Sequence, residues 1–414
     1  MSSISNIIFY IFIFSTVYAQ VFLLVTFLEN RKKIVIRKGS VKLSSYPAVT
    51  IVVPCWNEET TVEKTVDSLL ALNYPKDKLK IFLIDDGSTD STWGIISKFE
   101  NYPNIKTFRK ENGGKFTALN LGLENLKTDF FGGLDADSFA DSESLVRIMS
   151  YFEKDPSVMA VAPSLIVHNS KTLIQSAQKI EYLMAVYFKK MLGLLGAIHV
   201  TPGPLTVFRK RVFDDLGPYR HAHSTEDMEI AYRMQKNNYK IEHCNDAYVY
   251  TSIPGTVRKL FRQRLRWIYG FINNTIDYRN VLFRRKYGDF SFFTLPAGIV
   301  SIFAVSFLLG RIFYNLGNFL YSKVVQYQTV GIHFTASLNN FDLFFISTKS
   351  FIFLEILIFS LVFLSMILGK QMVEGKWRPS WNMLYFLLIF SVIAPFWLLK
   401  AIYNTIISEK PAWR

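Results

Sequence analysis

The sequence predicts an α/β domain with a mostly parallel sheet, joined to about four membrane-spanning helices. Between Val49 and Pro163, short β-branched and aromatic runs alternate with segments of helical periodicity, which is the pattern of βαβ units. Of the 414 residues, 50% are hydrophobic, and long apolar stretches stand near both ends of the chain. This length is enough for one globular domain and several spans.

Five strands and four helices are expected in the α/β region. The strands are expected at Val49–Pro54, Lys80–Asp85, Ile105–Phe108, Phe130–Asp135 and Val158–Ala162. The helices are expected at Thr60–Leu72, Asp90–Phe99, Lys115–Leu126 and Ser142–Phe152. Apolar residues at helical spacing also predict amphipathic helices at the membrane surface, one over Ile174–Leu195 and one around Val257–Ile268.

The apolar stretches divide the chain into four parts. The spans are expected near Ile7–Leu28, Phe292–Leu309, Phe351–Leu368 and Leu384–Leu399. We therefore expect a first span in residues 1–30, the α/β domain in 31–252, interfacial helices in 253–290 and a membrane region of about three helices in 291–414.

Charge predicts the orientation. A cluster of cations follows the first span, namely Arg31, Lys32, Lys33, Arg37, Lys38 and Lys42. By the positive-inside rule these cations hold the α/β domain in the cytosol of a multi-pass plasma membrane protein. Cys55 and Cys244, the two cysteines, fit a reducing compartment. The side of the C-terminus stays open.

The missing nucleotide motifs exclude two enzyme classes. No GxGxxG follows the first strand, and Gly113-Gly114-Lys115-Phe116 lacks the P-loop spacing, so a dehydrogenase or P-loop NTPase is not expected. The formal net charge of +14 fits nucleic acid, anionic lipid or phosphorylated substrates equally well. Carboxylates at strand ends instead predict a divalent cation, Mg²⁺ or Mn²⁺, that neutralises a diphosphate.

Polar residues gather where strands end, and one cleft beyond these ends is expected to collect them. Each group also has a structural interpretation as a turn or helix cap. The groups are Pro54-Cys55-Trp56-Asn57-Glu58, Asp85-Asp86-Gly87-Ser88 and Asp135-Ala136-Asp137. The first offers an aromatic face and polar groups to a base and ribose. The last offers two carboxylates to a cation.

Three later features fit the same cleft. Lys115 follows two glycines at an expected helix N-terminus, which suits phosphate. Thr225-Glu226-Asp227 opens a helix, where Asp227 can act as a general base or merely stand in an acidic first turn. Gln263-Arg264-Leu265-Arg266-Trp267 combines an amide, cations and an indole, and its structural alternative is a basic membrane-surface helix.

Apart from Lys115, these features are five motifs which, taken in order and flanked by spans, resemble the family 2 membrane glycosyltransferases, in particular the poly-N-acetylglucosamine, hyaluronan and chitin-type synthases. The five are Pro54–Glu58, Asp85–Ser88, Asp135–Asp137, Thr225–Asp227 and Gln263-x-x-Arg266-Trp267. Gly203-Pro204-Leu205, followed by Phe208-Arg209-Lys210, is similar to a segment near the acceptor site of hyaluronan synthases. The resemblance covers roughly Val49 to Gly270. Trp56 stands where tyrosine is more usual in that family.

The resemblance implies a GT-A fold, a UDP-sugar donor and inverting transfer. The donor would contact Pro54, Trp56, Asn57, Glu58, Asp85, Asp86, Lys115 and Asp135. Asp137, with Asp135, would hold the metal, and Asp227 would be the catalytic base. The acceptor and diphosphate would contact Gly203, Pro204, Glu226, Gln263, Arg266 and Trp267.

Three functions remain open at this stage. The first is transfer of a sugar, N-acetylglucosamine before others, to a growing β-linked polysaccharide that the spans export. The second is transfer of one sugar to a membrane lipid, as in ceramide- or diacylglycerol-type glucosyltransferases. The third is a non-catalytic nucleotide-sugar sensor or pore. The expected partners are the UDP-sugar, a carbohydrate or lipid acceptor and membrane lipid. Nucleic acid is not expected, and an accessory membrane subunit is left open.

Overall fold

The computed structural model describes residues 3–34, 39–330 and 350–411, and these form two compact units. The sheet unit comprises Leu23–Pro296 and Ser365–Arg414, and the helical unit comprises Met1–Phe22 and Ala297–Leu364. Arg37 and Lys38, two of the cations expected behind the first span, lie outside the described residues.

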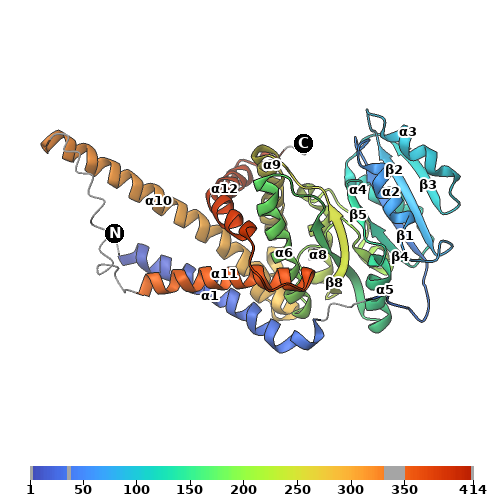
Figure 1. The fold of residues 1–414 in the computed structure, drawn as a ribbon, viewed down its shortest axis with the longest axis horizontal. Coiled ribbons are helices and arrows are strands. Elements are labelled where there is room, and N and C mark those ends of the chain that lie inside the picture. Colours follow the sequence, from blue (N-terminus) through green and yellow to red (C-terminus); the bar gives the residue numbers. More distant parts are fainter. Residues whose placement is uncertain (1–2, 35–38, 331–349, 412–414) are drawn as a thin grey trace. The chain divides into compact units, whose positions relative to one another are not determined.

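An eight-stranded sheet organises the sheet unit, in the order β3-β2-β1-β4-β7-β6-β8-β5 (Figure 1). Its strands are β1 Val49–Cys55, β2 Leu79–Asp86, β3 Ile105–Lys110, β4 Phe130–Gly133, β5 Ser138–Ala140, β6 Val158–Val167, β7 Val207–Arg209 and β8 Lys240–Thr251. The five strands expected from the sequence all form, as β1, β2, β3, β4 and β6.

The sheet is mixed. Strands β3, β2, β1 and β4 are parallel neighbours, as βαβ periodicity predicts, and β6 is parallel to β8. β7 lies antiparallel between β4 and β6, and β5 lies antiparallel to β8. The sequence did not signal β5, β7 or β8, because β5 and β7 have only 3 residues each and β8 buries polar residues that break the apolar pattern.

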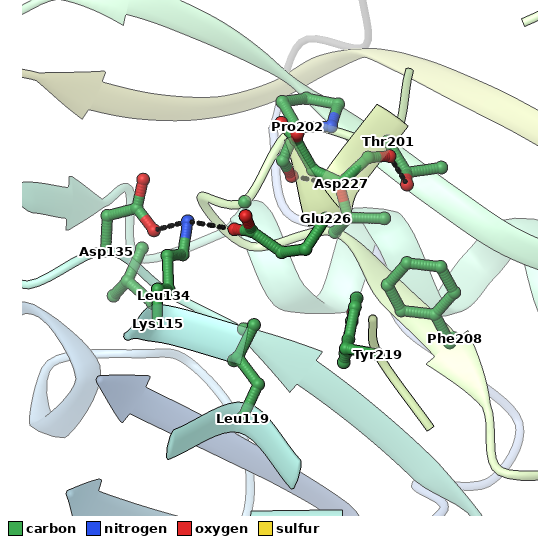
Figure 2. A pocket seen from close by; sticks show the side chains of 13 residues that line it. Lys115, Leu119, Leu134, Asp135, Thr201, Pro202, Phe208, Tyr219, Glu226 and Asp227 are labelled. Atoms are coloured by element: carbon green, nitrogen blue, oxygen red, sulfur yellow. Dashed lines mark hydrogen bonds and ion pairs between the residues drawn. The ribbon is translucent and has the colours of Figure 1, made fainter. Parts of the chain in front are cut away.

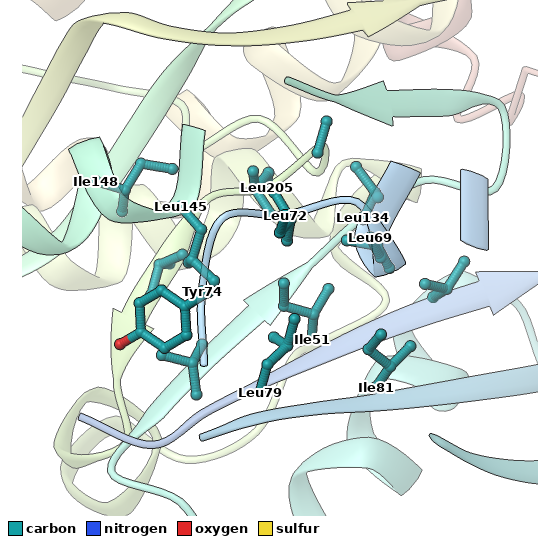
Figure 3. Packing of buried hydrophobic residues seen from close by; sticks show 14 of the residues in the cluster. Ile51, Leu69, Leu72, Tyr74, Leu79, Ile81, Leu134, Leu145, Ile148 and Leu205 are labelled. Carbon is teal, nitrogen blue, oxygen red and sulfur yellow. The ribbon is translucent and has the colours of Figure 1, made fainter. Parts of the chain in front are cut away.

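Helices cover both faces of the parallel strands, so β1 and β2 are apolar on both sides. On one face, α2 (Val62–Leu70) and α5 (Ser144–Lys154) pack against the sheet, and Figure 3 shows Leu69, Leu145 and Ile148 beside Ile51. Each fully buried aliphatic side chain of this kind stabilises the fold by about 1.5–3 kcal/mol.

Two further helices of the parallel region show how closely the layers approach. On α4 (Lys115–Glu124), a Cβ on Gly122 would lie 2.5 Å from a methyl group of Val52, so glycine permits that helix to reach β1.

The helix expected over Asp90–Phe99 is instead a short α3 (Thr92–Ile96) followed by a 3₁₀ turn, Ser97–Asn101. Gly94 in its centre weakens a longer α-helix.

Behind β8 lies a helical layer made of α6 (Leu173–Leu194), α8 (Glu226–Lys236), α9 (Val257–Asp277) and α12 (Trp381–Ile406) (Figure 1). The two expected amphipathic helices are α6 and α9. Both pack along α12, where Leu265 and Tyr269 of α9 meet Ala401. Much of the apolar side of α9 is therefore covered by α12 rather than left for a lipid surface. A short helix, α7 (Arg211–Leu216), comes between β7 and α8 in the sequence.

Four helices among the described residues are long and apolar enough to cross a membrane, Ile4–Asn30, Phe290–Thr329, Ile356–Glu374 and Trp381–Ile406. They belong to α1 (Ser3–Asn30), α10 (Leu295–Val330), α11 (Ser350–Glu374) and α12, and each overlaps one expected span. The helix α10 continues well past Leu309, to Val330. Within the helical unit, Phe12 packs on Phe307 with ring centroids 5.6 Å apart.

Candidate active site

A pocket opens beyond the carboxyl end of β4. Its walls come from α4, the segment after β4, the loop before β7 and the start of α8 (Figure 2). It contains about 290 Å³ of space not occupied by atoms. Its lining residues are Lys115, Leu119, Gly133, Leu134, Asp135, Thr201, Pro202, Gly203, Thr206, Phe208, Tyr219, Glu226 and Asp227. Segments more than a hundred residues apart thus meet at one place.

Lys115 joins two acidic segments across this pocket. Its Nζ lies 2.6 Å from Oδ1 of Asp135 and 3.2 Å from Oε1 of Glu226 (Figure 2). Burial by itself lowers the pKa of Lys115, but the carboxylates of Asp135, Glu226 and Asp227 outweigh burial and raise it. Lys115 therefore carries a permanent positive charge where α4 begins, as a phosphate site requires.

The loop before β7 closes one side of the pocket. A Cβ on Gly203 would contact Nζ of Lys115 and lie 2.9 Å from Oδ1 of Asp135, so only glycine leaves this ion pair undisturbed. The hydroxyl of Thr201 donates to the carbonyl oxygen of Asp227 at 2.8 Å. Pro204, which we expected at the acceptor site, is buried, and Pro202 lines the pocket in its place.

Two adjacent carboxylates at the start of α8 ionise differently. Burial raises the pKa of Glu226, but Lys115 more than compensates, so this pKa ends below its usual value. Burial and the neighbouring charge of Glu226 raise the pKa of Asp227 to about 6, against the opposing effects of Lys115 and Arg266. A carboxylate that ionises just below neutral pH is suited to accept a proton.

Asp137 stands at the other end of the Asp-Ala-Asp segment. Its side chain is half-buried, and Ser138 donates a hydrogen bond to its Oδ1 at 3.1 Å. Burial, followed by the negative charges of Asp135 and Glu58, raises the pKa of Asp137 to about 7. The surroundings of Asp137 thus carry an excess of negative charge, which a bound cation would balance.

The donor set fits a hard divalent cation. No cluster of three or more His, Cys, Asp or Glu side chains suited to a metal occurs in the part of the chain that the structure describes. Asp135 is paired with Lys115, whereas Asp137 accepts its hydrogen bond from the neutral hydroxyl of Ser138. Mg²⁺ is commonly held by one or two carboxylates together with substrate phosphates. Asp137 with Asp135 satisfies that requirement.

The ends of β1 and β2 are tied together. Cys55 pairs with Asp85 in the parallel register, and the backbone N–H of Asn57 donates to Ser88 Oγ at 3.0 Å. Asp85 is fully buried and lies 3.2 Å from Nε of Arg109, whose guanidinium also lies over the ring of Trp93. Pro54, Trp56 and Glu58, the other residues expected here, are all partly buried on the same segment.

Asp86 organises the glycine loop. Its carboxylate accepts hydrogen bonds from the backbone N–H groups of Gly113, at 3.1 Å, and Gly114, at 2.8 Å, and from Nζ of Lys110 at 2.6 Å. These contacts fix the turn from which α4 and Lys115 start. Asp86, which we expected to bind the donor, makes these three contacts within the protein, and they place Lys115 at the start of α4.

The α9 motif contacts the segment that leads into α8, whose first residues line the pocket. Arg266 donates from Nη1 to the carbonyl oxygen of Ser224 at 3.1 Å and lowers the pKa of both Glu226 and Asp227. Gln263 and Trp267 both contact Arg264. Gly270 lies so close to the side chain of Thr225 that any Cβ there would collide with it. Helix α9 thus supports the start of α8.

Sequence reasoning missed several residues at the site. Thr201, Pro202 and Tyr219 line the pocket, and Tyr219 is buried with its pKa raised by burial. The signal available was the Thr-Pro-Gly-Pro turn, of which only Gly203 and Pro204 were selected. Tyr219 carries no local signal, because its place depends on how the loop after α7 folds back to α4, where it exchanges hydrogen bonds with Asn120.

Residues 50–217 match the family model described as Glycosyl transferase family 2. This stretch contains the β1, β2 and β4 ends, Lys115 and the loop of Gly203. Residues 50–217 are a family 2 glycosyltransferase domain. The enzyme class implied by the motifs agrees with this match.

Curated relatives of this glycosyltransferase domain are poly-β-1,6-N-acetyl-D-glucosamine synthases. The chain is 31% identical over 236 residues to that of Staphylococcus aureus strain COL, a match that covers 56% of this chain and 57% of the relative. It is 31% identical over 224 residues to that of Staphylococcus epidermidis, covering 54% of each. The matches span little more than half the length of these relatives.

A solved structure shares the fold of this chain over nearly its whole length. The mannosyltransferase PcManGT from Pyrobaculum calidifontis, in complex with GDP-Man and Mn²⁺, superposes with a TM-score of 0.61 over 96% of this chain and 99% of its own. Sequence identity is 16%, so the likeness concerns the fold alone.

Asp86→Asn is expected to loosen the glycine loop of the glycosyltransferase domain. The amide that replaces one carboxylate oxygen cannot accept from all three donors, and each buried donor left without a partner costs about 1–3 kcal/mol. Hydrogen–deuterium exchange should then be faster at Gly113 and Gly114. The control is Asp214→Asn, where an exposed carboxylate makes only a surface ion pair. Unchanged exchange in Asp86→Asn would show that Asp86 does not hold the loop.

Proposed function

We propose that this chain is an inverting glycosyltransferase that moves N-acetylglucosamine from a UDP-sugar to the growing end of a β-linked polysaccharide. The observation that carries the proposal is the pocket in which Lys115 pairs with Asp135 and Glu226 beside Asp227. It combines a cation for a diphosphate with a carboxylate of raised pKa for an acceptor. The names of the curated relatives favour a polymer of β-1,6-linked N-acetylglucosamine as product.

The chemistry assigned to the pocket is one displacement. Asp227 takes the proton of an acceptor hydroxyl as that oxygen bonds to the anomeric carbon, and the bond from this carbon to the UDP oxygen breaks. Lys115 and Arg266 stabilise the negative charge on the departing diphosphate. Attack and departure take place on opposite faces, so the anomeric configuration inverts.

The residues proposed to bind the donor and those proposed to bind the acceptor come from different segments of the chain. Pro54, Trp56, Asn57, Glu58 and Asp85 would bind the nucleotide beyond β1 and β2. Gly203, Glu226, Gln263, Arg266 and Trp267 would bind the acceptor and diphosphate. A divalent cation, Mg²⁺ or Mn²⁺, would be held by Asp137 with Asp135 and would neutralise diphosphate charge. The excess negative charge around Asp137 supports this assignment.

The chain is a membrane protein with four apolar helices long enough to cross a bilayer. We assign it to the plasma membrane with the glycosyltransferase domain in the cytosol, because Arg31, Lys32 and Lys42 follow α1. UDP-sugars would then be used on the cytosolic side, and the polymer would leave through the spans of the same chain. Residues 31–252 and 253–290 would form the catalytic and interfacial parts.

The product distinguishes the candidate functions. The purified full chain in detergent is incubated with Mg²⁺ or Mn²⁺ and radiolabelled UDP-GlcNAc, UDP-Glc, UDP-GlcA or GDP-Man. We expect UDP release and a large, water-soluble product from UDP-GlcNAc. A product extracted by organic solvent would establish lipid glycosylation instead, and no released nucleotide from any donor would establish a non-catalytic binding protein.

Asp227→Asn should retain UDP-GlcNAc binding and lose transfer by roughly 10²–10⁴-fold, the usual contribution of a general base. Calorimetry measures the Kd of the donor, and UDP release with acceptor measures the rate. Asp67→Asn, at an exposed position on α2, is the control and should match the wild type. Near-normal turnover by Asp227→Asn with tight donor binding would remove Asp227 from this role.

The transfer rate should follow the ionisation of Asp227. The pKa of Asp227 is raised to about 6, and the carboxyl accepts a proton only when ionised, so the rate should be flat above this pH. Below about pH 6 it should fall toward tenfold per pH unit. Initial rates at saturating donor between pH 5 and 8, with circular dichroism to check folding, test this. A rate still flat at pH 5 in folded protein would contradict it.

A further inference from the structure

Arg264 is a buried cation inside the α9 motif that the proposed chemistry does not use. Its side chain is 5% exposed, and its Nη2 donates to Oε2 of Glu181 on α6 at 2.5 Å. Its Nη1 donates to Oε1 of Gln263 at 3.1 Å. Its Cζ lies 4.1 Å from the ring centroid of Trp267. One guanidinium therefore contacts both Gln263 and Trp267, two residues assigned to the acceptor.

Helix geometry explains the contact between Arg264 and Trp267. Residues three apart lie on one side of a helix, so Trp267 lies over Arg264 within α9. The planar guanidinium offers its face to the indole while its edges donate to Glu181 and Gln263. Lysine, with a single ammonium group, cannot stack and fork in this way. The position therefore requires arginine and not only a positive charge.

The helix that carries the pair packs beside the start of α8, which lines the pocket. Arg266, two residues after Arg264 on α9, donates from Nη1 to the carbonyl oxygen of Ser224 at 3.1 Å. Gly270, on the same helix, lies against the side chain of Thr225. Gln263 and Trp267 therefore stand on a helix that adjoins the segment of Glu226 and Asp227, where an acceptor would meet the donor in the proposed function.

We propose that Arg264, held by Glu181, is a positioning residue that sets the indole of Trp267 and the amide of Gln263 to receive the acceptor sugar. The inference rests on the proposed function. Gln263 loses a fixed orientation without Arg264, and Trp267 loses the cation against its face, a contact worth about 0.5–2 kcal/mol. A purely structural ion pair between α6 and α9 would instead affect stability alone.

Arg264→Lys separates these two roles. Lysine keeps the charge for Glu181 and should keep Tm close to the wild type, but it cannot stack on Trp267 and reach Gln263 together. With UDP-GlcNAc and β-1,6-linked N-acetylglucosamine oligosaccharides, we expect the acceptor KM to rise and kcat to fall, each by several-fold or more. The donor Kd should stay within about twofold. Arg262→Met, an exposed arginine on the same helix, is the matched control and should match the wild type.

A double variant tests whether the pair acts as one unit. Glu181→Leu and Arg264→Met should each reduce transfer, and the two together should cost no more than Arg264→Met alone, because removing both partners leaves no buried charge without a partner. Full activity in Arg264→Lys, or losses that multiply in the double variant, would overturn the positioning role. An equal loss of donor binding would also overturn it.

Fluorescence keeps this test separate from the proposed function. The acrylamide quenching of Trp267 is taken as the difference between each protein and its Trp267→Phe counterpart. It should increase in Arg264→Lys, because the indole is released from the guanidinium. If wild-type protein turns over no sugar nucleotide, the proposed function fails while this measurement still reports on the pair. Unchanged quenching would show that Arg264 does not hold Trp267.

Discussion

The shared ion pair of Lys115 with Asp135 and Glu226 is the interaction on which the site depends. It ties together the start of α4, the segment after β4 and the start of α8, which are distant in sequence. Other contacts serve this one. Asp86 fixes the turn before Lys115, and Gly203 leaves room around the pair. Three carboxylates around one half-buried ammonium leave a net negative charge, which favours the binding of a further positive charge. Within the proposed function, that charge arrives with a divalent cation.

The layer of α6, α9 and α12 links this pocket to helices of membrane character. Helix α12 is apolar enough to cross a bilayer, yet α9 and α6 pack along it. The apolar side of α9 binds to α12, while its polar residues turn toward α6 and α8. Helix α9 thus connects a candidate span to the start of α8 through the contact of Gly270 with Thr225. Within the proposed function, a polymer made in this pocket would leave it close to α12, a candidate membrane span.

Sequence patterns located those residues of the candidate site that stand next to the end of a regular strand or at the start of a regular helix. Asp85, Asp135 and Lys115 stand at the ends of strands or the start of a helix, so alternation and glycine spacing located them. Tyr219 lies in a loop and Glu181 on another helix, and no local pattern marks either of them. Thr201 belongs to a Thr-Pro-Gly-Pro turn, from which only Gly203 and Pro204 were selected. Asp86 shows a different limit, because the sequence marks it as a candidate ligand but does not reveal that it accepts hydrogen bonds from the backbone of Gly113 and Gly114.

The sequence by itself determined the parallel strands, the four apolar helices and the order of the motifs, because each depends on residues close together in the chain. Hydrophobic periodicity and turn residues are local signals. The tertiary structure alone decided that β7 enters antiparallel between β4 and β6, and that α12 covers α9. It also decided the ionisation of the Asp-Ala-Asp segment. Asp135 and Asp137 are the same residue type one position apart, yet Lys115 reaches Asp135 while burial raises the pKa of Asp137. Charge and burial depend on neighbours brought from elsewhere in the chain, and no pattern within one segment records them.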